Sequence, residues 1–164
     1  MSNYVTHLEC SISGEHYPAG HIHGLSKAGR PLVVRYDLDR MRNEVSKQDI
    51  AASTANGFWR YAPMLPVTKP ESRISLGEVV TPLMPLTSSA PMLGGVSGNI
   101  IVKDEGRLPT GSFKARGLAL AVSMAHEFGL DHLAIPTNGN AGAAMAAYAR
   151  QAGMRATVLC PSDT

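Results

Sequence analysis

The chain has 164 residues, of which 44% are hydrophobic and 17% charged, and its formal net charge is +2. This balance is typical of a globular protein with about one domain, and the charge is too small for a nucleic-acid-binding surface. No apolar run approaches the ~18 residues of a membrane-spanning helix, and the first residues lack the pattern of a signal peptide. We therefore expect a cytoplasmic protein that binds neither nucleic acid nor membrane.

The first 70 residues show no regular alternation of strands and helices. Residues 31–36 (PLVVRY) are rich in β-branched side chains and predict a short strand. Residues 39–48 predict a polar helix, and the many Pro and Gly of residues 71–98 predict loops with short strands. We expect an N-terminal segment over residues 1–70 and a second region over residues 71–164.

The second region has the pattern of an α/β fold. The predicted elements alternate as strand, helix, strand, helix and strand over residues 100–103, 113–128, 133–136, 141–152 and 155–160. Ser112 is a good N-cap for the first helix, and Gly129 is a good stop after it. This alternation is typical of the α/β class with a parallel sheet. The last strand is expected to be buried, and because parallel sheets are covered by helices, the chain looks truncated after it.

Two segments of this region carry groups suited to chemistry. Lys114 stands at the start of a predicted helix, where an amine can bind a carbonyl cofactor as an imine. Residues 137–140 (TNGN) lie between a strand and an alanine-rich helix, where backbone N–H groups bind anions and where ligands gather in α/β folds. A solvated lysine and a simple polar turn are the plain alternatives. Together the two segments indicate amine chemistry on an acidic substrate.

The cysteines and histidines near the N-terminus raise the question of a metal site. Cys10, His16, His21 and His23 supply one thiol and three imidazoles. A structural zinc site normally has four ligands in short paired spacings, which these residues lack. We therefore expect no metal near Cys10 and assign no metal ligands. Cys10 and Cys160 lie far apart and do not suggest a disulfide framework.

The residues of the second region resemble a known family. Residues 102–106 (VKDEG) and 109–114 (PTGSFK) resemble the lysine segment of fold-type II pyridoxal-phosphate enzymes. Residues 137–141 (TNGNA) resemble the loop with which these enzymes bind the substrate carboxylate, and residues 75–83 resemble an upstream segment of the family. Two N-terminal segments narrow the resemblance to the threonine synthase family, namely residues 31–38 and 59–67.

The resemblance implies a fold, a cofactor and a reaction. The fold would be tryptophan-synthase-β-like, with two α/β domains and pyridoxal 5'-phosphate between them. Lys114 would attach the cofactor and move protons, and Asn140 would hydrogen-bond the ring oxygen of the cofactor. The substrate carboxylate would bind to the backbone N–H groups of Thr137, Asn138, Gly139, Asn140 and Ala141. The implied reaction converts O-phospho-L-homoserine and water to L-threonine and phosphate, a lyase step of threonine biosynthesis.

The chain departs from the family pattern at several positions. Ala115 follows the lysine where the family often has Asp, and Val79-Val80 stands where glycines are usual. Many relatives begin with a zinc ribbon, but here Ser13, Ser26 and Ala28 occupy expected cysteine positions. Residues 1–70 would then begin with a degenerate zinc-ribbon-like segment that has lost its metal.

The resemblance also implies that residues 71–164 are an incomplete catalytic region. The family's loop for the cofactor phosphate and its partner for the pyridine nitrogen lie further toward the C-terminus. We therefore expect an N-terminal fragment that is inactive by itself, with a homodimer as a possible state of the full-length enzyme. Two alternatives stay open: another fold-type II enzyme, such as a threonine dehydratase or a cysteate synthase-like enzyme, or an inactive truncated product.

Overall fold

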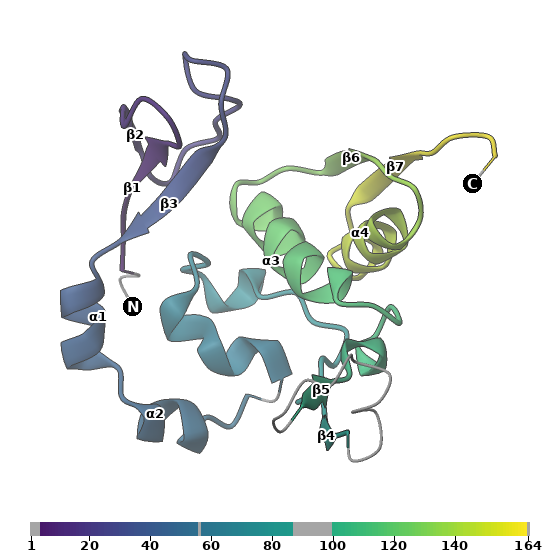
Figure 1. Cartoon of the computed structure of the whole chain (residues 1–164). Helices are drawn as coiled ribbons and strands as arrows, with labels where there is room; N and C mark the ends of the chain where they lie inside the picture. Colours follow the sequence, from purple (N-terminus) through teal and green to yellow (C-terminus); the bar gives the residue numbers. More distant parts are fainter. Residues whose placement is uncertain (1–3, 56, 87–99, 164) are drawn as a thin grey trace.

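The computed structural model describes residues 4–55, 57–86 and 100–163. Seven strands, four α-helices and three 3-10 helices follow one another in this part of the chain (Figure 1). In order they are β1 (Val5–Cys10), β2 (His16–Pro18), β3 (Leu32–Tyr36), α1 (Leu38–Glu44), α2 (Lys47–Ala52), η1 (Gly57–Met64), η2 (Pro70–Ser72), β4 (Leu83–Pro85), β5 (Ile101–Lys103), η3 (Glu105–Arg107), α3 (Lys114–Glu127), β6 (His132–Pro136), α4 (Asn140–Gln151) and β7 (Arg155–Leu159).

The strands form three small sheets. β1 lies between β2 and β3 in an antiparallel sheet near the N-terminus, and β4 pairs with β5 antiparallel. β6 and β7 pair in parallel, with α4 as the connection between them. This β6–α4–β7 unit confirms the α/β character expected from the sequence. The strands predicted over residues 31–36, 133–136 and 155–160 are confirmed to within one residue at each end.

The strand predicted over residues 100–103 forms, but not in the expected parallel sheet. It is β5, and it pairs antiparallel with β4, with Met84 opposite Val102. Polar contacts beyond the strands hold this pair in place, because Asp104 N–H donates to the Pro82 carbonyl over 3.1 Å and the Thr81 hydroxyl donates to Glu105 Oε1 over 2.6 Å. The short strand predicted within residues 71–98 is β4, whereas residues 87–98 lie outside the described residues.

The single polar helix predicted over residues 39–48 is two helices. Helix α1 ends at Val45, whose backbone is extended, and α2 begins after Ser46. The Ser46 hydroxyl accepts from Asp49 N–H, and the Asp49 carboxylate accepts from Ser46 N–H. Such a capping box satisfies free donors of a new helix and therefore favours a break at this point.

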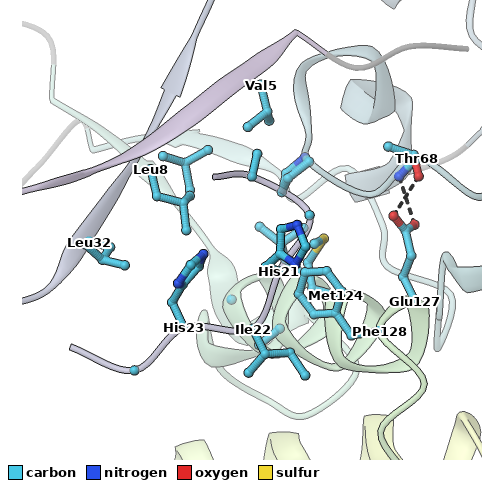
Figure 2. Close-up of a pocket in the computed structure, with 18 residues that line it drawn as sticks. Val5, Leu8, His21, Ile22, His23, Leu32, Thr68, Met124, Glu127 and Phe128 are labelled. Carbon is cyan, nitrogen blue, oxygen red and sulfur yellow. Dashed lines mark hydrogen bonds between the residues drawn. The ribbon is translucent and has the colours of Figure 1, made fainter. Parts of the chain in front are cut away.

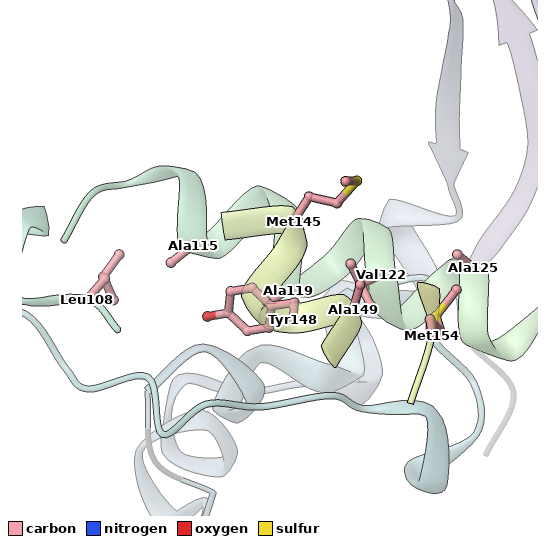
Figure 3. Packing of buried hydrophobic residues seen from close by; sticks show 9 residues of the cluster. All are labelled: Leu108, Ala115, Ala119, Val122, Ala125, Met145, Tyr148, Ala149 and Met154. Atoms are coloured by element: carbon pink, nitrogen blue, oxygen red, sulfur yellow. The ribbon is translucent and has the colours of Figure 1, made fainter. Parts of the chain in front are cut away.

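The main core lies between α3 and α4 (Figure 3). Ala115, Ala119 and Val122 of α3 are fully buried against Tyr148 and Ala149 of α4. The three residues of α3 recur on one face of the helix at a spacing of three to four residues, as an amphipathic pattern requires. Because most of these side chains are small, the two helices approach closely, and their N-terminal ends take a defined position relative to each other.

Helix α4 also packs directly on the strands that it connects. A Cβ atom at Gly142 would lie 2.5 Å from Thr137 Cγ2 and 2.6 Å from Val158 Cγ1, so only glycine fits. The prediction that β7 is a buried strand is wrong for the described residues, since all five of its residues are exposed. The reason is that the β6–β7 sheet contacts α4 and that no described helix covers its other face.

The segment before residue 70 packs on the second region. Trp59, Ala62 and Val67 form a buried cluster with Leu120 and Met124 of α3. Further along, Thr68 donates its N–H and hydroxyl to the Glu127 carboxylate over 2.9 and 2.6 Å, as Figure 2 shows. The division at residue 70 stays a prediction, and these contacts cross it.

An apolar groove of about 540 Å³ separates the N-terminal sheet from α3. His21, Ile22, Met124 and Phe128 are among the residues that line it (Figure 2). Among the described residues, no helix combines the length and the hydropathy that crossing a membrane requires.

Candidate active site

The structure brings the two chemically suggestive segments together. Lys114, Pro136 and residues 137–141 line one open depression of about 510 Å³. Lys114 begins α3 and Asn140 begins α4, so the depression lies where the first turns of both helices meet. The close packing of the α3 and α4 alanines produces this meeting of an amine with a helix N-terminus.

The start of α3 differs from the predicted one by one residue. The helix begins at Lys114, and Ser112 is not its N-cap, because no side-chain capping bond exists there. A turn at Gly111, with a positive φ of 69°, places Ser112 and Phe113 before the helix instead. Ala115 points into the core and is completely buried, so the adjacent Lys114 is directed away from the core. The predicted stop at Gly129 is confirmed, since α3 ends at Glu127 and Gly129 has a φ of 75°.

A charged network holds the first turn of α3. The Arg116 guanidinium donates to both oxygens of the Glu105 carboxylate, to Oε1 over 2.9 Å, and the Thr81 hydroxyl donates to Oε1 as well. Arg116 also reaches Thr81 Oγ1 over 3.3 Å. These contacts, led by Arg116, lower the pKa of Glu105 to about 2, so the carboxylate is ionised and the bidentate pair is maintained. The network therefore orients the helix turn that carries Lys114.

Two lysines come near this network, and their surroundings differ. The Lys103 amine donates to Thr81 Oγ1 and lies 3.5 Å from Glu105 Oε1, so it is engaged as a cation. Lys114 Nζ lies 4.7 Å from the centre of the Phe113 ring, and this is the one contact of its amine within residues 4–55, 57–86 and 100–163. The Lys114 amine is thus the one available to a ligand in the depression.

The loop between β6 and α4 has an unusual backbone. Gly139 is the N-cap of α4 with φ 143° and ψ −97°, a conformation that L side chains rarely adopt. Thr137 shapes the loop, because its hydroxyl oxygen accepts from Gly139 N–H over 3.0 Å and from Gly142 N–H over 3.2 Å. Side-chain acceptors of this kind replace a conventional N-cap.

These bonds decide which backbone donors of the loop remain for a ligand. Thr137 N–H donates to the Leu159 carbonyl over 2.9 Å, and Gly139 N–H is bound by Thr137. Two of the five N–H groups that we expect to bind the substrate carboxylate thus have acceptors within the protein, and the role of the loop stays a prediction. Asn140 and Ala141 are the first helical residues, and their backbone N–H groups have no intrahelical acceptors. These N–H groups form the positive end of the helix dipole.

The four N-terminal residues considered for a metal do not converge. His23 Nε2 lies 2.8 Å from the Pro18 carbonyl, and His21 lies beside the groove in Figure 2. Cys10 is buried elsewhere, with Sγ 3.1 Å from Ser26 Oγ and 3.4 Å from Ser13 N. Cys10, Ser13 and Ser26 thus lie together, as the positions of a degenerate ribbon would. The absence of a metal there stays a prediction.

The fold and the depression define an α/β protein with a lysine amine beside the N-terminus of a helix, and comparison with known proteins gives the class. Residues 74–164 match the family of pyridoxal-phosphate-dependent enzymes, and the chain belongs to this family. The family's cofactor is pyridoxal phosphate.

Several similar proteins are named threonine synthase. That of Methanocaldococcus jannaschii is 34% identical over 152 residues, which are 93% of this chain and 37% of the relative. That of Methanosarcina acetivorans is 34% identical over 157 residues, 95% of this chain and 37% of the relative. That of a Synechocystis species is 44% identical over 101 residues, 62% of this chain and 26% of the relative. The chain thus spans little more than a third of the length of the first two relatives.

The residues of the depression fit the cofactor of the family. An aldehyde cofactor needs an accessible amine, which Lys114 offers, and hydrogen-bond donors for its oxygens and for an acidic substrate. Next to the lysine, Thr110 Oγ1 and Ser112 Oγ are buried without a hydrogen-bond partner among the described residues. Buried hydroxyls without partners are rare, and a polar ligand at the start of α3 is one means to satisfy them.

Sequence reasoning missed the network around Glu105. The signal was present, because Arg116 follows Lys114 by two residues and Glu105 belongs to the VKDEG segment. Nothing in the sequence showed that Thr81 joins them, since the three residues come from three different segments.

Proposed function

We propose that the protein containing this chain is a threonine synthase, which converts O-phospho-L-homoserine and water to L-threonine and phosphate. The observation that carries the proposal is the shared depression, in which the Lys114 amine faces the N-terminus of α4. The similarity to proteins named threonine synthase over more than nine tenths of the chain supports this choice of reaction.

The family resemblance suggests roles for these residues, and the geometry of the depression supports them. Lys114 attaches the cofactor through its amine and, when released, takes and returns protons at Cα and Cβ of the substrate. Bound pyridoxal phosphate supplies the electron sink for the carbanions that these proton transfers produce. The N–H groups of Asn140 and Ala141 bind the substrate carboxylate, where the helix dipole favours an anion. Asn140, whose side chain is exposed beside Lys114, donates to the ring oxygen of the cofactor.

The reaction is tested with the purified full-length protein, as its natural gene encodes it. With pyridoxal phosphate and O-phospho-L-homoserine, we expect threonine and phosphate to appear in equal amounts. If the protein instead releases ammonia when threonine is supplied, it is a dehydratase. Phosphate release from O-phosphoserine that requires sulfite would identify a cysteate synthase-like enzyme. Either result, without threonine formation, contradicts the proposal.

The variant Asn140→Ala should lose activity without losing stability. Asn140 is the first helical residue and makes no side-chain capping bond, so its truncation should change the free energy of unfolding by less than about 0.5 kcal/mol. Loss of one hydrogen bond of about 1–1.5 kcal/mol to the cofactor should lower kcat/KM about 10-fold. Thermal unfolding and steady-state kinetics measure the two effects.

The exposed Asn43→Ala on α1 is the matched control, with both quantities unchanged. A lower melting temperature of Asn140→Ala with unchanged kcat/KM would show that Asn140 only supports the helix.

A further inference from the structure

The N-terminal sheet carries a group of metal-ligating side chains that the proposed function does not use. His7, Glu9 and His16 each present one ligand atom, and the three atoms lie within 4.8 Å of one another. His7 Nε2 lies 3.7 Å from Glu9 Oε2, and His16 Nε2 lies 3.8 Å from the same oxygen. The carboxylate oxygen is therefore flanked by two imidazole nitrogens.

The strand pairing explains why these side chains meet. Glu9 of β1 is directly opposite His16 of β2 in the antiparallel register. Side chains two residues apart lie on the same face of a strand, so His7 is next to Glu9 on this face. Leu8, between them, points to the other face and borders the apolar groove. The group is thus built by the sheet and lies on the face turned away from the groove.

The hydrogen bonds around Thr6 are compatible with a His7 tautomer that carries its proton on Nδ1. The Thr6 hydroxyl donates its proton to the Arg35 carbonyl over 3.2 Å. Thr6 Oγ1 also lies 2.9 Å from His7 Nδ1, and with its own proton donated to Arg35 it can accept a proton from Nδ1. His7 Nε2 then carries a free lone pair, and this atom is buried without a partner among the described residues. A histidine ligand oriented through its other nitrogen is the usual arrangement in metal sites.

Glu9 is oriented in a similar way. Arg35 donates to Glu9 Oε1 over 2.6 Å, which leaves Oε2 toward the two imidazoles. Both Glu9 and His7 thus have the supporting contacts that hold ligands in place.

We propose that His7, Glu9 and His16 form a binding site for a divalent transition-metal ion, with Zn²⁺ as the ion that this donor set fits best. Two imidazoles and one carboxylate are a common zinc ligand set with a position left for water. The site differs from the ribbon position at Cys10, because it uses none of the cysteine or serine groups there. It revises the expectation that this chain has no metal ligands.

The present geometry needs a small adjustment to bind zinc. Ligand atoms ~2.1 Å from a tetrahedral zinc ion are about 3.4 Å from one another, close to the 3.7 and 3.8 Å found here. The rings of His7 and His16 now stack, with centroids 3.9 Å apart and planes at 32°. His16, whose side chain is 64% exposed, can turn so that its Nε2 lone pair meets that of His7.

The site is tested by titrating Zn²⁺ into untagged protein that has been freed of metal with a chelator. Isothermal titration calorimetry measures the affinity and the number of ions bound. We expect one ion per chain, and much weaker binding in His16→Ala. The variant Thr6→Val replaces no metal ligand, but it removes the hydroxyl that contacts His7 Nδ1, and it should weaken binding ~10–100-fold. Valine suits a strand, so this variant should fold normally, and circular dichroism checks this.

Two control variants distinguish this site from zinc binding elsewhere on the chain. His21→Ala removes a nearby exposed histidine outside the group and should leave affinity unchanged. Cys10→Ser should also leave it unchanged, and the Co²⁺-loaded protein should show no thiolate charge-transfer band. No binding of Zn²⁺ to the folded wild type, equal affinity in His16→Ala, or affinity that depends on Cys10 would each overturn the proposal.

Discussion

Replacement of Lys114 by alanine should abolish attachment of pyridoxal phosphate and lower turnover of O-phosphohomoserine by ~10²–10⁴-fold or more. The Lys114 amine lines the depression with residues 137–141, whereas the Lys103 amine is engaged by Thr81 and Glu105. Borohydride reduction of the wild type with cofactor, followed by peptide mapping, should label Lys114. Label on Lys103 would contradict the assignment.

Two further variants make this result specific. Lys114→Arg keeps the positive charge but offers no amine for an imine, so it should be as inactive as Lys114→Ala. Lys47→Ala removes an exposed lysine that also begins a helix, and labelling and turnover should not change. Retained turnover in Lys114→Arg would show that only a positive charge is required at this position. It would contradict the covalent attachment of the cofactor to Lys114.

The second large effect is expected for stability, in the variant Glu78→Ala. Glu78 is only 2% exposed and accepts from the hydroxyls of Tyr148 and Ser75, each over 2.6 Å, and from Leu76 N–H over 3.0 Å. Tyr148 is completely buried, and its hydroxyl would lose the acceptor that Glu78 provides. Each buried donor left unsatisfied costs about 1–3 kcal/mol, and we expect the free energy of unfolding to fall by at least this amount in denaturant titrations.

The isosteric variant and a surface variant test the cause. Glu78→Gln keeps one carbonyl oxygen as acceptor and should lose less stability than Glu78→Ala. Glu71→Ala, at an exposed position, should change stability little. Equal losses in Glu78→Ala and Glu71→Ala would show that the buried network contributes nothing.

The pH dependence of unfolding gives a separate check on Glu78. Burial raises the pKa of its carboxyl, but the hydrogen bonds from Ser75, Tyr148 and Leu76 outweigh it, and the pKa lies below the ordinary 4.5. A carboxyl with a lowered pKa in the folded state stabilises the protein above pH 4.5 and loses this effect as the pH falls through the lower value. The wild type should therefore lose more stability than Glu78→Gln when acidified.

The sequence by itself determined the local elements of the second region and the two segments that line the depression. Helices over residues 114–127 and 140–151 follow from the spacing of their apolar residues, and the glycines after them end them. Lys114 and the loop at residues 137–141 were identified from motif and position alone. Such signals are readable because capping, periodicity and glycine conformations depend on neighbours along the chain.

The tertiary structure alone decided which of these pieces meet. The antiparallel pairing of β5 with β4, the contact of Glu78 with Tyr148 across 70 residues, and the joining of His7 and Glu9 with His16 have no local signal. The backbone bonds that withdraw Thr137 and Gly139 from ligand binding likewise depend on the Leu159 carbonyl and on the loop's own fold. The physical reason is that hydrogen bonds and burial between distant segments follow from how helices and strands pack, and one sequence leaves several such packings open until the core is built.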